Sequence, residues 1–264
     1  MAFCRDPLGR GLIPAMPDNG HPVIFKDVSY RIGGNLVLDR LSFEVPAGET
    51  LVLLGRSGSG KTTALKMVNA LLLPTSGEVV VGGKATTQWD LIRLRRGIGY
   101  VIQDTGLFPH FTIERNVGLV PALERWPAER IRSRARELLE QVGLDPAAYL
   151  ARYPRQLSGG QRQRVGVARA LAADPAILLF DEPFGAVDPV TRVELQNQFL
   201  DLRRKVGKTS IFVTHDVREA LRIGSRIGLL HSGRLEVLVP PAEFIRADTA
   251  EARAFLAGLE EPVL

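Results

Sequence analysis

The residues best suited to chemistry form a glycine-rich stretch, Gly55-Arg-Ser-Gly-Ser-Gly-Lys61-Thr62, with the spacing G-x-x-x-x-G-K-[ST]. It follows a short apolar run and precedes a helical pattern, so backbone N–H groups can close around phosphate oxygens at the positive end of a helix. Lys61 is expected to reach the β- and γ-phosphates of a nucleotide, and Thr62 to offer its hydroxyl to Mg²⁺. The predicted phosphate-binding residues are Gly55, Arg56, Ser57, Gly58, Ser59, Gly60, Lys61, Thr62 and Thr63.

Two adjacent carboxylates end a second apolar run, where Ile177 to Phe180 is followed by Asp181 and Glu182. Hard oxygen ligands at this position could meet a metal held at the phosphates, so Asp181 is predicted to bind Mg²⁺. Glu182 points in a different direction and is predicted to orient or deprotonate an attacking water. An isolated Asp-Glu pair is usually a solvated turn, but the neighbouring phosphate loop favours the catalytic interpretation.

A third segment, Leu157-Ser-Gly-Gly-Gln161, begins a helix rich in arginine and alanine. Ser158 is suited to cap that helix, and a helix start of this composition can also bind an anion. Both roles are compatible. One chain with two phosphate-binding ends suggests a composite site that includes Ser158, Gly159, Gly160 and Gln161.

The elements that must position these motifs alternate between strands and helices. Residues 23–30 and 36–45 alternate apolar and polar side chains around a glycine turn, which indicates an antiparallel hairpin layer. Alternation further along predicts a largely parallel sheet. Its expected strands are 50–54, 176–180 and 210–213, its expected helices are 61–72 and 190–205, and a hairpin is expected over 227–230 and 235–239.

The stretch from about 116 to 172 differs, because apolar residues recur there at helical spacing among many charges. The predicted fold is therefore an α/β phosphate-loop NTPase core with a mainly parallel sheet, an antiparallel β layer and an inserted α-helical subdomain. The expected organisation is an irregular arm over 1–22, one nucleotide-binding domain over 23–240 and a short helical tail over 241–264.

Composition limits the function classes. The chain of 264 residues is 45% hydrophobic and 24% charged, which is ordinary for a globular protein. No run approaches the roughly 18 apolar residues of a membrane-spanning helix, and the first twenty residues lack the pattern of a secretory signal, so a cytosolic protein is expected. Cys4, the single cysteine, cannot form an intramolecular disulfide. The net charge of +5 suits nucleotides, nucleic acid or a phospholipid surface but decides nothing.

The order of the phosphate loop, Gln103, Leu-Ser-Gly-Gly-Gln, Asp-Glu and His215 resembles the nucleotide-binding domain of ABC transporters over about residues 23–239. The resemblance implies an ATPase that uses ATP and Mg²⁺. It also implies that Tyr30 stacks on adenine and that Gln103 touches the metal and the attacking water. By the same resemblance, Asp188 lies at a dimer seam and His215 acts as a switch at the γ-phosphate.

In such proteins two cassettes, identical or homologous, enclose two ATP molecules, and Ser158 to Gln161 of one cassette cover the ATP of the other. The resemblance therefore implies a second cassette and transmembrane permease subunits as partners, at the cytoplasmic face of the membrane. Leu107, Phe108, Pro109 and Phe111 could form a docking surface for the permease or pack inside the helical subdomain.

Four segments, 98–103, 106–110, 120–126 and 181–185, resemble the ATPases of importers for glycine betaine, carnitine and choline. An external solute-binding protein is then an indirect partner. Many such ATPases continue into CBS domains, which are not expected here. A soluble ABC ATPase acting on nucleic acid is disfavoured by the single cassette and the lack of heptads, so no nucleic acid is expected. An exporter motor would keep the chemistry and change the cargo.

Overall fold

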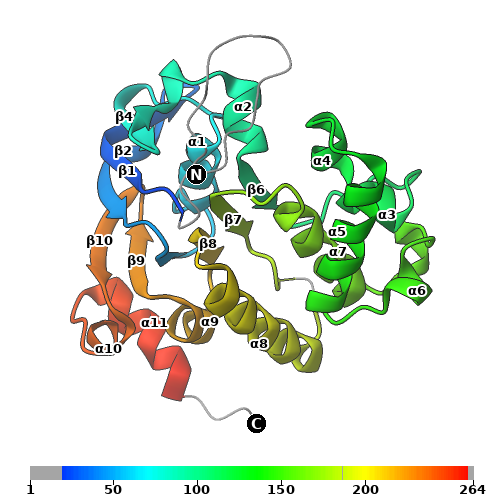
Figure 1. Ribbon diagram of the computed structural model, residues 1–264. Coiled ribbons are helices and arrows are strands. Elements are labelled where there is room, and N and C mark those ends of the chain that lie inside the picture. Colours follow the sequence, from blue (N-terminus) through cyan, green and yellow to red (C-terminus); the bar gives the residue numbers. More distant parts are fainter. Residues whose placement is uncertain (1–19, 186, 261–264) are drawn as a thin grey trace.

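The computed structural model describes residues 20–185 and 187–260, and these residues form two β-sheets with helices around them (Figure 1). The expected arm lies almost entirely outside the described residues, as do Cys4 and the last four residues of the expected tail. No helix in the described part of the chain is long and apolar enough to cross a membrane.

The larger sheet has six strands in the order β10-β9-β3-β8-β7-β6. Strands β9, β3, β8, β7 and β6 run parallel to their neighbours, whereas β10 is antiparallel to β9. The central strands β3, β7 and β8 are buried along their whole length and are mainly apolar, because both faces of the sheet are covered there. Their bounds are β3 Thr50–Leu54, β6 Ile98–Val101, β7 Ile177–Asp181, β8 Thr209–Thr214, β9 Arg226–His231 and β10 Arg234–Val239.

The two faces of this sheet belong to two hydrophobic clusters. In β3, Leu51 and Leu53 point to the cluster shared with helix α1 and the second sheet, whereas Val52 and Leu54 point to the cluster shared with the later helices. Helix α1, Lys61–Val68, contacts both sheets and is thereby fixed between them. The loop that precedes α1 therefore leaves a fully buried strand and enters a buried helix.

The smaller sheet is antiparallel, with the order β2-β1-β4-β5. Phe25 and Phe43 stack across the β1–β2 pair with ring centroids 4.4 Å apart. The expected hairpin is present, but the sequence analysis missed β4 and β5. The bounds are β1 Val23–Ile32, β2 Asn35–Val45, β4 Ser76–Val81 and β5 Lys84–Ala85, followed by the 3-10 turn η1 Thr86–Gln88 and helix α2 Leu91–Arg96.

A run of helices lies between β6 and β7 and stands to one side of the sheets (green in Figure 1). Its amphipathic helix α5 buries Ala135, Leu138 and Leu139 and packs against α7. The elements are α3 Ile113–Val117, α4 Leu119–Leu123, α5 Ala128–Gln141, α6 Pro146–Tyr149, η2 Pro154–Gln156 and α7 Gly159–Leu171. The remaining helices are α8 Pro189–Val206, α9 Val217–Ile223, α10 Pro241–Phe244 and α11 Ala250–Glu260.

The predicted fold class is confirmed: a mainly parallel sheet, an antiparallel layer and a helical insertion are all present. One local expectation was wrong, since the helix expected over 61–72 ends at Val68. Ala70 adopts a left-handed backbone conformation with φ of 51°, which a helix cannot continue through.

Candidate functional site

The phosphate loop joins the carboxyl end of β3 to α1, at the place where parallel sheets bind ligands. Gly60, directly before α1, has φ of 101°, and a Cβ there would lie 2.6 Å from Leu38 Cδ2. A Cβ on Gly55 would collide with the carbonyl oxygen of Leu230 in β9. Both positions therefore require glycine. The two glycines of the motif thus also allow β2 and β9 to pack closely against the loop.

Lys61 turns back into this loop. Its Nζ donates to the carbonyl oxygens of Gly55 at 2.7 Å and Arg56 at 2.8 Å, and the residue is only 4% exposed. Burial lowers the pKa of the Lys61 ammonium, and the charges of Glu182 and Asp181 partly offset that effect. A desolvated cation at the start of α1 is well placed to attract phosphate oxygens.

Asp181 ends β7 beside the loop. Its Oδ1 accepts a hydrogen bond from Thr62 Oγ1 at 2.7 Å, and its Oδ2 accepts one from Tyr100 Oη at 3.2 Å. Burial and the Asp181 charge raise the pKa of Tyr100, so this phenol stays a donor. The structure thus brings together Thr62 and Asp181, two of the three residues expected at the metal, the third being Gln103. Sequence reasoning missed Tyr100, whose only signal was its place in a strand-like segment before Gln103.

Glu182 turns away from the strand direction of Asp181. It has φ of 45°, a left-handed conformation that costs a non-glycine residue about 1–3 kcal/mol, and its N–H donates to Val213 O of β8 at 3.0 Å. The carboxylate Oε2 then lies 3.2 Å from His215 Nδ1. Strained backbone of this kind often accompanies function. Here it brings together the expected base and the expected switch histidine.

A buried network supports the loop that carries His215. Thr214 Oγ1, at the end of β8, donates to Glu219 Oε2 of α9 at 2.6 Å, and Gln196 Nε2 of α8 donates to Glu219 Oε1 at 3.3 Å. Asp216 caps α9 by accepting N–H groups of its first turn. Sequence reasoning did not single out Glu219, because a lone glutamate in a helix gives no sign of burial.

We expect Glu219→Gln to change how stability depends on pH. Burial is the main cause that raises the pKa of Glu219 above its usual 4.5, so folding favours the protonated form. Its stabilising contribution is present below pH 4.5 and is lost as pH rises through the raised folded-state pKa. Urea unfolding from pH 4 to pH 8 should show the stability of Glu219→Gln rising relative to the parent over that window.

Exposed Glu243 provides the control for this experiment. Glu243→Gln should leave the pH profile of stability unchanged. Parallel pH profiles for Glu219→Gln and the parent would show that folding does not perturb the Glu219 carboxyl.

The segment from Ser158 to Gln161 forms a complete capping box at the start of α7. Ser158 Oγ accepts the Gln161 N–H at 3.2 Å, and Gln161 Oε1 accepts the Ser158 N–H at 2.9 Å. Gln161 also donates to Tyr149 Oη at 2.9 Å. In the described part of the chain, no hydrogen bond joins this segment to the phosphate loop. The structure therefore presents a second, rigid helix start apart from the first.

The other expected site residues occupy separate positions. Tyr30 is half-buried in β1, and Gln103 is exposed in the turn after β6. Asp188 lies at the start of α8, where its Oδ1 accepts the Thr191 N–H at 3.0 Å. That backbone hydrogen bond is the main cause that lowers the pKa of Asp188.

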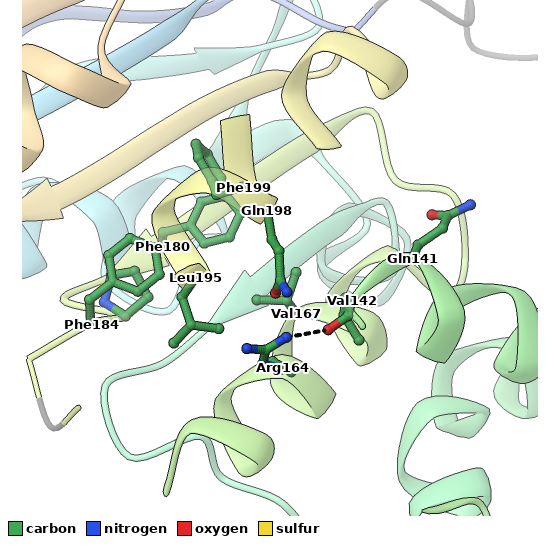
Figure 2. Close-up of a pocket in the computed structure, with 10 residues that line it drawn as sticks. Gln141, Val142, Arg164, Val167, Phe180, Phe184, Leu195, Gln198 and Phe199 are labelled. Carbon is green, nitrogen blue, oxygen red and sulfur yellow. Dashed lines mark hydrogen bonds between the residues drawn. The ribbon is translucent and has the colours of Figure 1, made fainter. Parts of the chain in front are cut away.

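A small cavity lies between the helical insertion, the end of β7 and α8, and Phe180 and Phe184 both line it (Figure 2). Its volume is about 20 Å³ and its lining is mainly apolar, with Phe180 and Phe199 on the core side. Arg164 of α7 links the helical insertion to α8 beside this cavity, because it donates to Val142 O at 3.1 Å and pairs with Glu194 of α8 at 3.0 Å. Polar contacts therefore help to hold the helical insertion against α8.

The profile of the ABC transporter family matches residues 38–185, which include the phosphate loop, Ser158 to Gln161 and both carboxylates. This chain belongs to the ABC transporter family. The matched region therefore contains the phosphate loop and the Asp181–Glu182 pair, which lie together in the fold, as well as the segment from Ser158 to Gln161, which has no hydrogen bond to them within the described residues.

Similar proteins include ATP-binding proteins of importers. The ABC cassette is 52% identical over 208 residues to the osmoprotectant import ATP-binding protein OsmV of Salmonella typhimurium, covering 79% of this chain and 54% of that protein. It is 49% identical to the glycine betaine/carnitine/choline transport ATP-binding protein OpuCA of Bacillus subtilis, covering 81% and 56%. The cassette thus spans about half the length of these relatives.

Two solved structures of similar shape are described as dimeric. One, described as a post-hydrolysis state of an ATP-binding cassette bound to ADP and Pi, superposes with a TM-score of 0.75 at 36% identity and covers 83% of this chain and 98% of that one. A second, described as a bacterial ABC transporter cassette, gives the same values.

Proposed function

We propose that this ABC cassette is the ATP-binding and ATP-hydrolysing subunit that energises an importer of quaternary-amine osmoprotectants. One observation carries the catalytic part: the ends of the neighbouring strands β3, β8 and β7 bring Lys61, His215 and the Asp181–Glu182 pair to one edge of the sheet. A cation for phosphates, a carboxylate beside a hydroxyl, and a carboxylate beside an imidazole are the groups that phosphoryl transfer to water requires.

The donors present fit Mg²⁺. Thr62 Oγ1 and Asp181 Oδ1 are 2.7 Å apart, and hydroxyl and carboxylate oxygens are the ligands that Mg²⁺ prefers. Among the described residues, no cluster of three acidic, histidine or cysteine side chains could hold a metal alone. This agrees with a metal held jointly with nucleotide phosphates. Bound there with Gln103 as a further ligand, Mg²⁺ would neutralise charge that develops on the phosphate oxygens.

In this proposal each of the remaining site residues has its own role in binding or hydrolysing ATP. The backbone amides of the loop 55–63 and the Lys61 ammonium hold the phosphates, and Tyr30 stacks on adenine. Glu182 accepts a proton from the attacking water, while His215 fixes the Glu182 carboxylate at one end and faces the γ-phosphate. Ser158 to Gln161 and Asp188 act on the nucleotide of a second cassette, identical or homologous. In the described part of their own cassette they make no hydrogen bond to the phosphate loop.

The proposed partners at the membrane are permease subunits, with an external solute-binding protein as an indirect partner. A surface for the permease lies just after Gln103, where buried Asn116 accepts from Phe108 N–H and donates to the carbonyl oxygens of Phe108, Phe111 and Thr112. Phe108 is thereby held 41% exposed, whereas Leu107 packs against the core. With a permease as its partner, the cassette is proposed to act at the cytoplasmic face of the membrane.

The cargo is proposed from the relatives, whose names refer to osmoprotectants, glycine betaine, carnitine and choline. If the proposal is right, the cassette purified with its membrane partners and placed in vesicles will take up one of these quaternary amines when ATP is supplied. Uptake of radiolabelled glycine betaine, choline and carnitine provides the measurement.

The same complex carrying Glu182→Gln is the matched control and should take up none of them. Robust ATP-dependent uptake of an unrelated solute, with none of the three amines transported, would refute the cargo and leave the ATPase assignment intact. Failure to release phosphate from ATP would refute the ATPase itself.

A further inference from the structure

The C-terminal helix α11 contains a buried carboxylate that the proposed mechanism does not use. Thr249 starts this helix by accepting the Ala252 N–H at 3.1 Å, and fully buried Ala252 anchors the first turn in the core beside α9 (Figure 1). Glu251 is fixed between them, with its side chain only 9% exposed. Buried carboxylates usually require a charged partner.

The partner of Glu251 is a residue of the phosphate loop. Arg56 Nε donates to Glu251 Oε1 at 2.7 Å, although 195 positions separate the two residues in the chain. His231, at the end of β9, lies 3.9 Å from the other oxygen of Glu251 and pairs more closely with Glu236 at 2.9 Å. The Arg56 guanidinium is therefore the main group that holds the Glu251 charge.

The backbone of Arg56 in turn contacts Lys61. The Arg56 carbonyl oxygen accepts from Lys61 Nζ at 2.8 Å and from the Ser59 N–H at 3.2 Å. A second tie comes from the β9–β10 hairpin, where the Gly233 N–H donates to Ser59 O at 3.2 Å. The C-terminal part of the chain thus contacts the phosphate loop at two points, the side chain of Arg56 and the backbone of Ser59.

We propose that Glu251 is a positioning residue for the nucleotide site: by holding the Arg56 side chain it fixes the Arg56 carbonyl, and thereby the turn against which Lys61 and Ser59 are placed. This inference rests on the proposed ATPase function. A loop fixed before binding loses less conformational freedom when it closes on phosphates. Release of Arg56 should therefore weaken ATP binding while Asp181, Glu182 and His215 keep their geometry.

The test is ATP hydrolysis by Glu251→Gln, Arg56→Gln and the double variant, together with direct binding of a fluorescent ATP analogue. Loss of a charged hydrogen bond with one exposed partner should raise KM for ATP about threefold to tenfold, with kcat little changed. If Glu251 acts through Arg56, the double variant will show no larger effect than either single one.

Asp248→Asn is the matched control, because Asp248 forms an exposed ion pair with Arg253 at 3.2 Å in the same region and should leave KM unchanged. Because the Arg56 side chain is exposed, Arg56→Gln still tests the Arg56–Glu251 pair if the change at buried Glu251 impairs folding. Parent-like KM and analogue binding in Arg56→Gln would overturn the proposal, as would additive effects. A KM that falls in Glu251→Gln would also overturn it, by showing that the carboxylate restrains Arg56 from the phosphates. An inactive parent would instead refute the ATPase function.

Discussion

Glu182→Gln is expected to lower ATP hydrolysis by about 100-fold or more, because the amide cannot accept a proton from water. The substitution keeps the size of the side chain and leaves Lys61, Thr62 and Asp181 in place, so ATP should stay bound and uncleaved. If each nucleotide bridges two cassettes, mass action will then shift the protein from monomer to dimer. Size-exclusion chromatography with light scattering, with and without Mg-free ATP, measures this shift.

Ser158→Arg in the same background separates the two halves of this claim. Arginine at the exposed start of α7 adds bulk and charge to the surface proposed to cover the γ-phosphate, so it should restore the monomer. The phosphate loop keeps its own contacts, because Ser158 makes no hydrogen bond to it. Parent-rate hydrolysis by Glu182→Gln would contradict the role of the base. A monomer in saturating ATP, unaffected by Ser158→Arg, would contradict the two-chain site.

Local patterns predicted the parts of the site that depend on neighbouring residues. The glycine spacing located the loop at residues 55–62 because glycine is required both by backbone conformation at Gly60 and by close packing at Gly55. An apolar run followed by two carboxylates located Asp181 and Glu182, since the end of a buried parallel strand is exposed on one edge of the sheet. The capping interpretation of Ser158 was also readable from four consecutive residues.

The parts that sequence reasoning missed depend on contacts between distant segments. Tyr100 reaches Asp181 across 81 positions, and Arg56 reaches Glu251 across 195. Neither pair has a spacing that reveals it, because the register of the sheet and the docking of α11 decide which side chains meet. The strained backbone of Glu182 is equally hidden, since an ordinary residue adopts φ of 45° only when the surrounding structure imposes it.

The antiparallel sheet illustrates the same limit. Its first two strands form a hairpin and could be predicted from alternation and a glycine turn. Strand β4 pairs with β1 from beyond the phosphate loop and α1, and its register, with Val23 opposite Val81, depends on how α1 packs between the sheets. The three valines of β4 favour a strand locally, but the fold decides which strand they pair with and in which register.

Lys61→Ala is expected to abolish measurable ATP turnover and to weaken ATP binding about 10- to 100-fold, the effect of losing a charged hydrogen bond to phosphate. The substitution should not unfold the free protein. Burial lowers the pKa of Lys61, so its charge opposes folding below the folded-state pKa, and this opposition is relieved only as pH rises through that pKa. Loss of the charge therefore removes an unfavourable contribution at neutral pH, although the two hydrogen bonds to the loop are lost with it.

Calorimetric titration with ATP and thermal unfolding of the free protein separate binding from folding in this variant. Lys66→Ala is the matched control, because Lys66 lies on the same helix α1 but outside the loop, and it should retain parent-like turnover. Near-normal hydrolysis by Lys61→Ala with an unchanged unfolding temperature would remove the phosphate loop from the mechanism. A loss of binding with the unfolding temperature preserved would instead assign the effect to the ammonium group, whose contacts to the Gly55 and Arg56 carbonyls already place it inside the turn that must hold the phosphates.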